Sequence, residues 1–550
     1  MRVLRAILFI VLGLIAFVLA ALVPSHLRAL DVAVVRARGA DGPTLINEGA
    51  QLAKEEKPGP AALVMTAARA AEVPQHEDLA RYLDQFNAAK PEIARYGAAA
   101  AYLDPLFAQG AAAGGGPHPS VLDLLLPETA REMTLRMLKQ STRGGVQELL
   151  ANRELQRTTV LPPVHSASGQ ALDTAILLTA LLVQTDLMPE PVAGEVVALA
   201  SAANRGKSPG PVEAVYLDIL TLARKLNWAQ FTAFVGLADS VATLRELTHF
   251  GSQAPDRLAI VFTAAYLAGA GGPVAAYLRH YPEEAAGWLT LAMASGSDGV
   301  RLVLRQQKPL HDSGWRSRLA EQPLLGTLAR WLTRLALSLP ALALIFKYIQ
   351  WFNAAFCLVR GIALLLPHER SVEGPTVAAY QQQTLALLLV VFAVLFWEPH
   401  LARGEAETRP PVGWNLPVLN AAVGEQVNEA LKPIMTDINW IALLVFAVVQ
   451  AALYALNLIK LREIRRQSAA SELKLRLLDN EEHMFDAGLY VGLGGTVLGL
   501  ILPTFNVVQP SLMVAYASTL FGIIFVSLLK ICHVRPYRRG LILDSTLGSL

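Results

Sequence analysis

Apolar runs without charge lie at the two ends of the chain, whereas its middle has an ordinary mixture of polar and apolar residues. After the basic start Met1–Arg5, no charged residue occurs at 6–23. A second uncharged run covers Ile438–Ile459, and a third lies between Asp486 and Lys530. A helix rises about 1.5 Å per residue, so about 20 apolar residues cross the hydrocarbon core of a bilayer. The pattern therefore predicts membrane spans at both ends of the chain.

The third run is about twice as long as one span requires. Asn506 and the pair Gln509-Pro510 interrupt it near its middle, where such residues favour a tight turn. We therefore predict a single helix at about 438–459, followed by a helical hairpin with arms at about 487–507 and 511–530.

Two shorter apolar stretches, 335–359 and 384–397, leave two alternatives open. Lys347 divides the first stretch, and the second follows three glutamines. If both stretches span the bilayer, the chain has six membrane helices, and if both lie in the bilayer surface, it has four. Tryptophans are enriched at membrane boundaries, and three of them favour the count of six: Trp331, Trp351 and Trp397.

Lysine and arginine mark the cytoplasmic side of short loops in membrane proteins. Basic residues follow the predicted single helix and the predicted hairpin, whereas the turn at 506–510 carries no charge. With either number of spans, both termini are then cytoplasmic and the segment 26–325 lies outside. We expect a bacterial inner membrane, with 26–325 in the periplasm.

The apolar runs divide the chain into six predicted segments. They are an N-terminal membrane anchor at 1–25, an extracytoplasmic all-helical domain at 26–325, two membrane or interfacial helices at 326–400, an extracytoplasmic loop at 401–436, a three-helix membrane core at 437–535 and a cytoplasmic tail at 536–550. The run at 6–23 also fits a cleaved signal peptide, although we prefer an uncleaved anchor. The predicted fold class is an all-α polytopic membrane protein.

Short amphipathic helices separated by glycine and proline turns account for most of the segment 26–325. Strand patterns are scarce, so this domain is predicted to be all-helical, as either an α-solenoid or an irregular helical bundle. The clearest predicted helices are Ser120–Lys139, Ala171–Leu187, Val212–Asn227, Trp228–His249, Asp256–Ala268 and Pro273–His280.

Composition agrees with a membrane protein and argues against several other classes. The chain of 550 residues is 53% hydrophobic and only 17% charged, whereas soluble proteins carry about 25% charged residues. A net charge of +2 leaves no basic surface for nucleic acid. The chain has neither a Gly-x-Ser-x-Gly nor a His-Glu-x-x-His motif, and its 11 histidines are dispersed. We therefore predict no enzyme, no metal and no cofactor, and an unknown extracytoplasmic protein as a partner of 26–325.

Small residues line one face of each predicted hairpin arm. In the first arm Gly492, Gly495 and Gly499 recur at i, i+3 and i+7, which places them on one helix face beside Thr496. Such a face lets another helix approach closely in lipid.

The second arm repeats this spacing. Ala515, Ser518 and Gly522 share a face, and Thr519 lies next to it. One threonine in a membrane helix can bond to its own backbone, but two beside small-residue faces favour a polar lining.

These arms resemble the last two helices of the MotA/TolQ/ExbB proton-channel family. The family pattern is close to Gly-Leu-Leu-Gly-Thr-Val-x-Gly in the first helix and Thr-x-x-Gly in the second. The similar residues here are Gly492-Leu493-Gly494-Gly495-Thr496-Val497-Leu498-Gly499 and Thr519-Leu520-Phe521-Gly522. The resemblance covers about 438–540 and includes the order and direction of three helices.

The resemblance implies a homo-oligomeric ring, typically a pentamer, around the single helices of a TolR/ExbD-like partner. A carboxylate on the partner takes up and releases the ion, and Thr496 and Thr519 would lie along its path. The glycines that would allow close packing are Gly492, Gly495, Gly499 and Gly522. The expected function is that of a ring-forming subunit of a proton- or sodium-driven inner-membrane motor, which energises an envelope process such as protein transport.

The chain departs from this pattern in its acidic residues. ExbB-like members often carry a glutamate at the position of Val514, and here no acidic residue occurs at 487–529. A second, acid-bearing subunit is therefore required for ion transport. Two other functions stay open: a membrane-anchored helical scaffold in which the glycines serve packing alone, and a solute permease, for which Pro340, Lys347 and Arg360 are the candidate residues.

Overall fold

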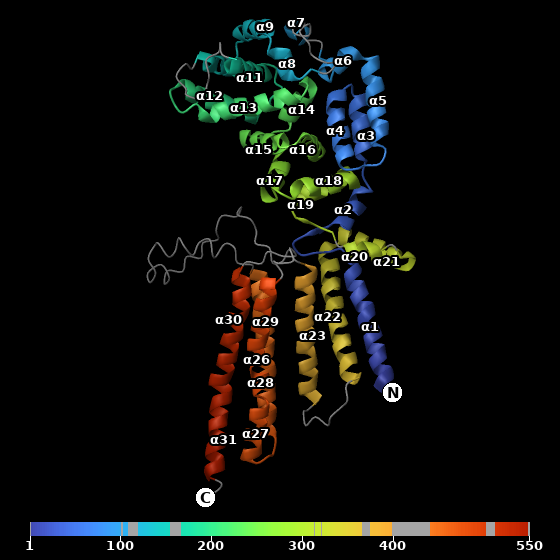
Figure 1. Ribbon diagram of the computed structural model, residues 1–550, viewed down its shortest axis with the longest axis vertical. Helices are drawn as coiled ribbons and strands as arrows, with labels where there is room; N and C mark the ends of the chain where they lie inside the picture. The colour runs from blue at the N-terminus through green and yellow to red at the C-terminus, as the bar shows by residue number, and fades with distance from the viewer. Residues whose placement is uncertain are drawn as a thin grey trace. The chain divides into compact units, whose positions relative to one another are not determined.

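The computed structural model describes residues 2–100, 103–107, 119–154, 167–312, 314–320, 322–365, 375–398, 440–501 and 512–547. The chain forms two compact units (Figure 1). The helical domain is Leu30–Asp312, and the apolar unit combines Met1–Ala29 with Ser313–Leu550. The described residues are helical almost throughout, which confirms the prediction of an all-α protein.

The helical domain consists of short helices closed by one pair of strands. The strands β1 (Leu30–Asp31) and β2 (Leu310–His311) pair in parallel at the two ends of the domain's sequence. The helices are α2 (Val32–Gly39), α3 (Leu45–Lys54), α4 (Pro58–Ala70), α5 (His76–Ala89), α6 (Pro91–Tyr96), α7 (Asp104–Phe107), α8 (Val121–Leu125), α9 (Glu128–Lys139), α10 (Gly144–Ala151), η3 (Asn152–Glu154), α11 (Ala167–Gln184), α12 (Glu190–Asn204), α13 (Gly210–Lys225), α14 (Trp228–Gly236), α15 (Val241–Ser252), α16 (Pro255–Ala268), α17 (Gly272–His280), α18 (Ala285–Ser295) and α19 (Ser297–Gln306).

Two predicted helices are each divided in the structure. The predicted helix Ser120–Lys139 forms α8 and α9, because Pro127 cannot donate a backbone hydrogen bond and restricts the residue before it. The predicted helix Trp228–His249 forms α14 and α15, because Ser240 caps a new start: its side chain accepts a hydrogen bond from the backbone N–H of Thr243. The other four predicted helices agree with α11, α13, α16 and α17 to within a few residues.

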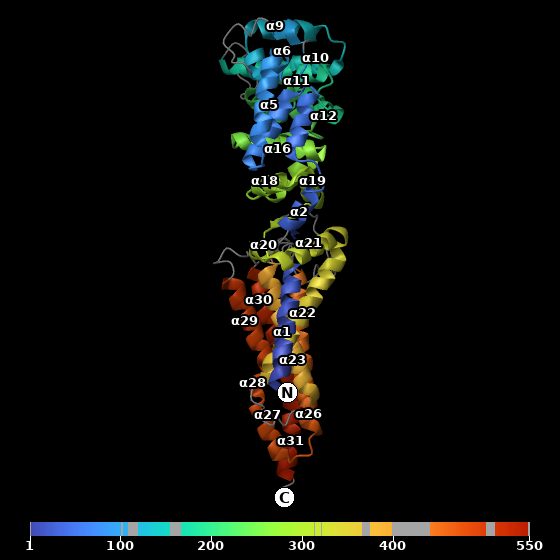
Figure 2. The same ribbon diagram turned by 90° about the vertical axis from the view of Figure 1, so that its right-hand side faces the viewer.

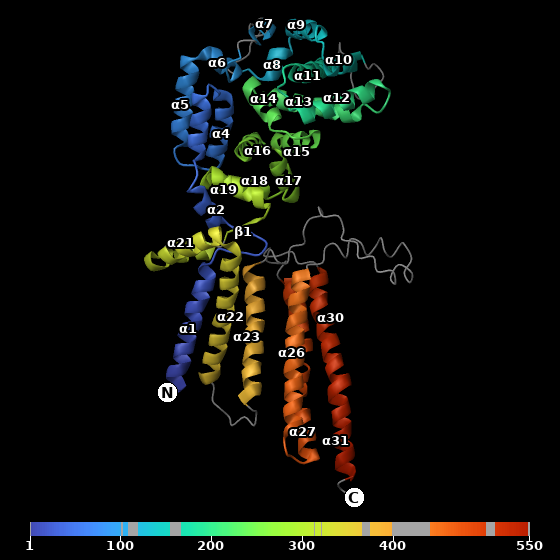
Figure 3. The ribbon, with the colours of Figure 1, turned by 180° about the vertical axis from the view of Figure 1, so that it is seen from behind.

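Helices far apart in the sequence pack together in this domain. α4 contacts its neighbours α3 and α5, and it also contacts α14, α16 and α18. A regular solenoid would restrict each repeat to its nearest neighbours. These contacts favour the irregular helical bundle over the solenoid. Figure 3 shows α4 and α5 alongside each other, with α15 to α19 below the layer of α11 to α13.

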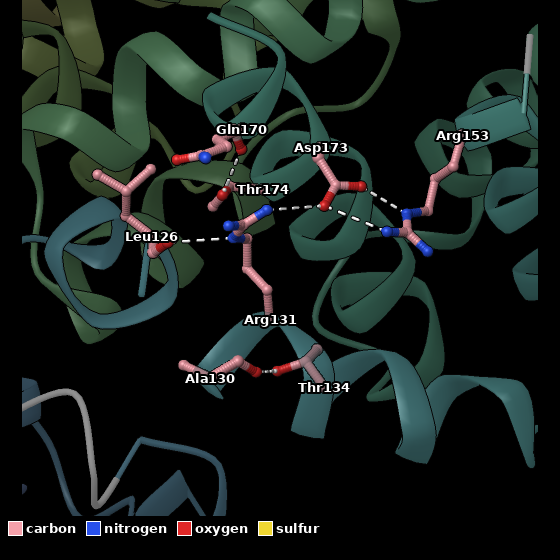
Figure 4. A network of polar contacts seen from close by, with 8 residues as sticks. All are labelled: Leu126, Ala130, Arg131, Thr134, Arg153, Gln170, Asp173 and Thr174. Atoms are coloured by element: carbon pink, nitrogen blue, oxygen red, sulfur yellow. Dashed lines mark hydrogen bonds and ion pairs between the residues drawn. The ribbon is translucent and has the colours of Figure 1, made fainter. Parts of the chain in front are cut away.

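One buried carboxylate joins three elements of the domain (Figure 4). Asp173 in α11 is 1% exposed and lies 3.2 Å from Nη1 of Arg131 in α9 and 3.2 Å from Nη2 of Arg153 in η3. The guanidinium of Arg131 also donates from Nε to the carbonyl oxygen of Leu126 at 3.1 Å. Because both arginines meet one buried acid, the network fixes α9 and η3 against α11.

The apolar unit contains longer helices. They are α1 (Arg2–Leu22), α20 (Gly314–Ala320), α21 (Pro323–Ser338), α22 (Pro340–Leu365), α23 (Pro375–Trp397), α26 (Trp440–Arg466), α27 (Ser471–Asn480), α28 (Glu482–Phe485), α29 (Ala487–Ile501), α30 (Leu512–Leu529), the π-helix η6 (Lys530–Val534) and α31 (Arg535–Leu547). Among the described residues, three helical segments are long and apolar enough to cross a membrane: Arg2–Leu22, Pro340–Leu365 and Tyr516–Asp544. The predicted loop 401–436 and the predicted turn 506–510 lie outside the described residues.

Lys347 does not divide an apolar stretch as its sequence position indicates. The predicted stretch 335–359 contains the end of α21, a break before Pro340 and then the continuous helix α22, in which Lys347 is buried. The break lies at the proline because a proline in the interior of a helix removes one backbone hydrogen bond.

α1 and α22 lie side by side and antiparallel (Figures 1 and 2). A Cβ added to Gly361 would lie 3.1 Å from the carbonyl oxygen of Ala6, and one added to Gly13 would lie 3.2 Å from that of Ala354. The rings of Phe17 and Trp351 meet edge to face with centroids 5.2 Å apart. Small residues thus bring these two backbones together along most of their length.

One carboxyl group in the helical domain is buried with an unsatisfied oxygen. Glu213 in the first turn of α13 is 3% exposed, and within the described part of the chain its Oε1 has no hydrogen-bond partner. Burial raises the pKa of this carboxyl group above its ordinary value of 4.5.

The pKa of Glu213 predicts how stability changes with pH. A raised pKa in the folded state means that its contribution to stability is present below pH 4.5 and is lost as the pH rises through the folded value. Glu213→Gln removes the charge, so we expect the melting temperature of the full chain to rise by a few degrees at pH 7 and to be unchanged at pH 4. Differential scanning fluorimetry in detergent measures this. Glu190→Gln, in the exposed first turn of α12, is the matched control and should give no gain. An equal gain at both pH values would contradict the assignment.

Candidate functional site

The two arms of the C-terminal hairpin, α29 and α30, touch at their backbones. A Cβ added to Gly492 would lie 2.8 Å from the carbonyl oxygen of Ser518. One added to Gly522 would lie 2.7 Å from the carbonyl oxygen of Gly488 and 3.4 Å from the Cα of Gly492. No side chain fits at these distances without separating the arms, so glycine is required at both positions.

This contact brings the two predicted threonines together. The hydroxyls of Thr496 in α29 and Thr519 in α30 are hydrogen-bonded to each other. Each hydroxyl oxygen also lies 3.2 Å from the carbonyl oxygen of Gly492. Ser518 adds a third hydroxyl, which donates to the same carbonyl at 2.9 Å and lies 3.2 Å from that of Thr496. We name these three residues the hydroxyl cluster.

The hydroxyl cluster has more donors than its central carbonyl accepts. A carbonyl oxygen has two lone pairs, and that of Gly492 also accepts a backbone hydrogen bond within α29, so the three hydroxyls cannot all donate to it at one time. The remaining hydroxyl donates to a neighbouring hydroxyl, and the donor roles can exchange without movement of the backbone. Thr496 is 8% exposed and Ser518 is fully buried. The cluster therefore offers uncharged oxygen ligands in an apolar surrounding, but it contains no group that holds a proton or an ion by charge at neutral pH.

The other predicted glycines differ in what surrounds them. A Cβ on Gly495 would lie 2.9 Å from Oγ of Ser518 and 3.1 Å from Cε1 of Phe446 in α26. Gly499 lies in α29, but its surroundings are outside the described part. Gly494 has open space on its side of the helix. Gly492, Gly495 and Gly522 thus serve packing within one chain.

Gln450 in α26 and Ser518 are participants that the sequence analysis missed. Gln450 is 1% exposed, and its Nε2 donates to the carbonyl oxygen of Gly488 at 2.9 Å. The available signal was a glutamine inside the uncharged run Ile438–Ile459, because a polar residue in such a run needs a partner. In the sequence, Ser518 stands out only as a small residue of the packing face.

Ion pairs join the ends of these helices beyond the hairpin. Nζ of Lys530 lies 2.8 Å from the carboxylate of Asp486, and Nζ of Lys460 lies 3.4 Å from that of Glu481. The basic residues that predict the cytoplasmic side therefore also connect α26 and η6 to the two acidic residues that flank α28.

A second polar cluster, which we name the ion cluster, lies at one end of α1, α22 and α23. Lys347 and Glu398 have side chains that are 4% and 3% exposed, and their Nζ and Oε1 atoms are 3.1 Å apart. Lys347 also donates to the carbonyl oxygen of Ser25 at 2.7 Å. Glu398 accepts a hydrogen bond from the hydroxyl of Tyr348 at 2.8 Å. His26 lies close to both charges, with Nδ1 3.3 Å from Nζ and 3.8 Å from Oε1.

The contacts of Lys347 and Arg360 argue against their role as permease residues. Lys347 is held by Glu398 and by the chain after α1, and Nη1 of Arg360 donates to Oε1 of Gln382 in α23 at 2.7 Å. Pro340 begins α22. The two charges that suggested a solute path therefore have partners inside the chain.

Comparison with protein-family models, with curated proteins and with solved structures finds no match to this chain. The resemblance of the hairpin therefore stays a prediction that rests on the residues of its two arms. Among the residues that the structure describes, no group of three or more His, Cys, Asp and Glu side chains is placed to hold a metal ion.

The backbone contact of the hairpin predicts different effects for two glycines. Gly522→Ala places a methyl group 2.7 Å from the carbonyl oxygen of Gly488, and overpacking of this kind costs about 1–3 kcal/mol. We expect backbone amides of α29 to exchange hydrogen about tenfold faster, because about 1.4 kcal/mol is a factor of ten. Hydrogen–deuterium exchange of the full chain measures this. Gly494→Ala, which meets open space, is the control and should leave exchange unchanged or slower.

The ion cluster predicts strong coupling between Lys347 and Glu398. Glu398→Gln leaves the lysine charge buried without its carboxylate, which costs about 3 kcal/mol, because an uncompensated buried charge is expensive. Adding Lys347→Met should recover most of that loss. A double-mutant cycle by thermal or chemical unfolding of the full chain measures the coupling. Losses that simply add would show that the two charges do not stabilise each other.

Proposed function

We propose that the chain is the ring-forming subunit of an ion-driven motor in a bacterial inner membrane. A TolR/ExbD-like partner with one membrane helix supplies the acidic residue, and the complex energises an envelope process. The observation that carries this proposal is the contact of Thr496 with Thr519 across the hairpin. The two threonines that resemble the family's path residues lie next to each other although they belong to different helices.

Membrane insertion is supported by the apolar helices and their exposed residues. α1, α22 and the segment Tyr516–Asp544 have the length and composition of membrane spans. On α29 the large side chains of Tyr490, Leu493 and Val497 are 56%, 54% and 46% exposed, a pattern that suits lipid or a neighbouring subunit. In this proposal both termini are cytoplasmic, and the helical domain lies in the periplasm, where it binds an envelope protein.

The partner is needed because the sequence 487–529, which contains the hairpin, has no acidic or basic side chain. Its described oxygens near the hydroxyl cluster belong to hydroxyls and backbone carbonyls, which stay uncharged at neutral pH. An ion that crosses the bilayer needs a site that binds and releases it, and a carboxylate on a moving partner provides one. The hydroxyls would then replace water around the ion as the carboxylate passes.

The motor proposal predicts that ion flow depends on the two threonine hydroxyls. Thr496→Val and Thr519→Val keep the volume and remove the hydroxyl, so we expect proton or sodium flux to fall at least tenfold while partner assembly stays intact. The chain and its partner, reconstituted together in liposomes with ion-sensitive dyes, provide the measurement. Thr496→Ser and Thr519→Ser keep the hydroxyl and should retain flux. Full flux in both valine variants would refute the ion path.

A structural observation also favours one alternative, a membrane-anchored helical scaffold. All three hydroxyls of the cluster lie within hydrogen-bond distance of the carbonyl oxygen of Gly492 in the same chain, so hairpin packing alone gives them a role. In a scaffold, the valine variants would loosen the hairpin, and the complex with its partner would show no ion flux even in its unsubstituted form. The same liposome measurement therefore separates the two functions.

A further inference from the structure

α21 has one face packed against the apolar unit and one face exposed. Its buried residues follow the helical spacing i, i+3, i+4 and i+7, and the helix contacts α1, α20 and α22. These buried residues are Ala329, Leu332, Thr333 and Ala336. The opposite face repeats the same spacing with exposed residues: Thr327, Arg330, Trp331, Arg334 and Ser338.

Arg316 fixes α21 at the level where two apolar helices end. The guanidinium of Arg316, itself 6% exposed, donates from Nε to the carbonyl oxygen of Leu22, the last residue of α1, at 3.1 Å. It also donates from Nη2 to Oγ1 of Thr333 in α21 at 3.3 Å. α21 ends at Ser338, and α22 begins at Pro340. Figures 1 and 3 both show α21 crossways to α1 and α22 at these ends.

The exposed face of α21 carries basic residues without acidic partners. Within the described ranges, neither Arg330 nor Arg334 forms an ion pair, and Nη2 of Arg330 donates only weakly to Oγ1 of Thr327 at 3.4 Å. Trp331 is 60% exposed, and Leu339 just beyond the helix is 53% exposed. Arginines beside an exposed tryptophan, on a helix that lies across the ends of membrane spans, are typical of a helix in the bilayer surface.

We propose that α21 lies in the bilayer surface and that Arg330 and Arg334 bind the phosphates of anionic phospholipid headgroups. The charges are complementary, and each guanidinium can give two parallel hydrogen bonds to one phosphate. Trp331 and Leu339 border the arginines and enter the boundary between headgroups and acyl chains. The inference rests on the proposed membrane insertion of α1 and α22, but not on ion conduction. In this arrangement α21 sets the depth of α1 and α22 in the bilayer, because Arg316 links α21 to the end of α1.

Hydrogen–deuterium exchange of the full chain in nanodiscs tests this inference. The discs contain phosphatidylcholine alone, phosphatidylcholine with phosphatidylglycerol, or phosphatidylcholine with inorganic phosphate in the buffer. Two arginines at an anionic membrane surface shift the equilibrium between the bound and the unbound helix by more than about tenfold. We therefore expect amides of Thr327–Ser338 to exchange about tenfold more slowly in the phosphatidylglycerol discs, and inorganic phosphate to have no effect.

Matched double variants assign the effect to the two arginines. Arg330→Gln with Arg334→Gln should abolish the difference between the lipids. Arg224→Gln with Arg305→Gln, which replaces two exposed arginines of the helical domain, should leave the difference unchanged. Equal exchange in both lipids, protection by inorganic phosphate alone, or a difference that persists without Arg330 and Arg334 would overturn the inference. Protection of α1 and α22 in the same data reports membrane insertion separately.

Discussion

The backbone contact between Gly492 and Gly522 is the interaction on which the C-terminal hairpin depends. A Cβ at either position would lie within 3 Å of a carbonyl oxygen on the other arm. Because the arms approach this closely, the carbonyl of Gly492 is within reach of hydroxyls from both helices. A carbonyl that already accepts a helical hydrogen bond has limited capacity for more, and three hydroxyls compete for it. The glycines therefore create the hydroxyl cluster as well as the packing.

The same constraint, that a polar group away from water must find a partner inside the chain, recurs through the apolar unit. Gln450 donates to Gly488, Arg360 to Gln382, and Lys347 meets Glu398 and the carbonyl of Ser25. Each pair joins two segments that are separate in sequence. Charges that are matched in this way hold helices together, and moving one of them would leave its partner buried and uncompensated. They are therefore better suited to fixing the unit than to carrying a solute through it.

Local composition determines how much of this structure follows from the sequence. Uncharged runs are local properties, and so is the spacing of small residues and threonines within each arm, so the helices and the hairpin glycines are predictable. Partners are not local. Lys347 interrupts an apolar run in the sequence, and only the fold brings Glu398 to it and makes the helix continuous. Asp173 is similar, because nothing near it in α11 indicates that Arg131 and Arg153 converge on it. In the helical domain, a single proline, Pro127, outweighs an amphipathic pattern that otherwise continues.

The distribution of charge in the apolar unit bears on how the proposed motor would work. Its buried charges Lys347 and Glu398 are paired in the ion cluster, and Lys530 is paired with Asp486 beyond the hairpin. The hydroxyl cluster is neutral, so it binds no ion by itself and imposes no large electrostatic barrier on an ion. A chain built in this way stabilises an ion only while another group carries the charge. In the proposed motor, energy would enter through the relative position of two subunits, because binding and release would depend on whether the carrier faces the hydroxyls. Under that proposal, an ion gradient would drive movement of the carrier rather than a change within this chain.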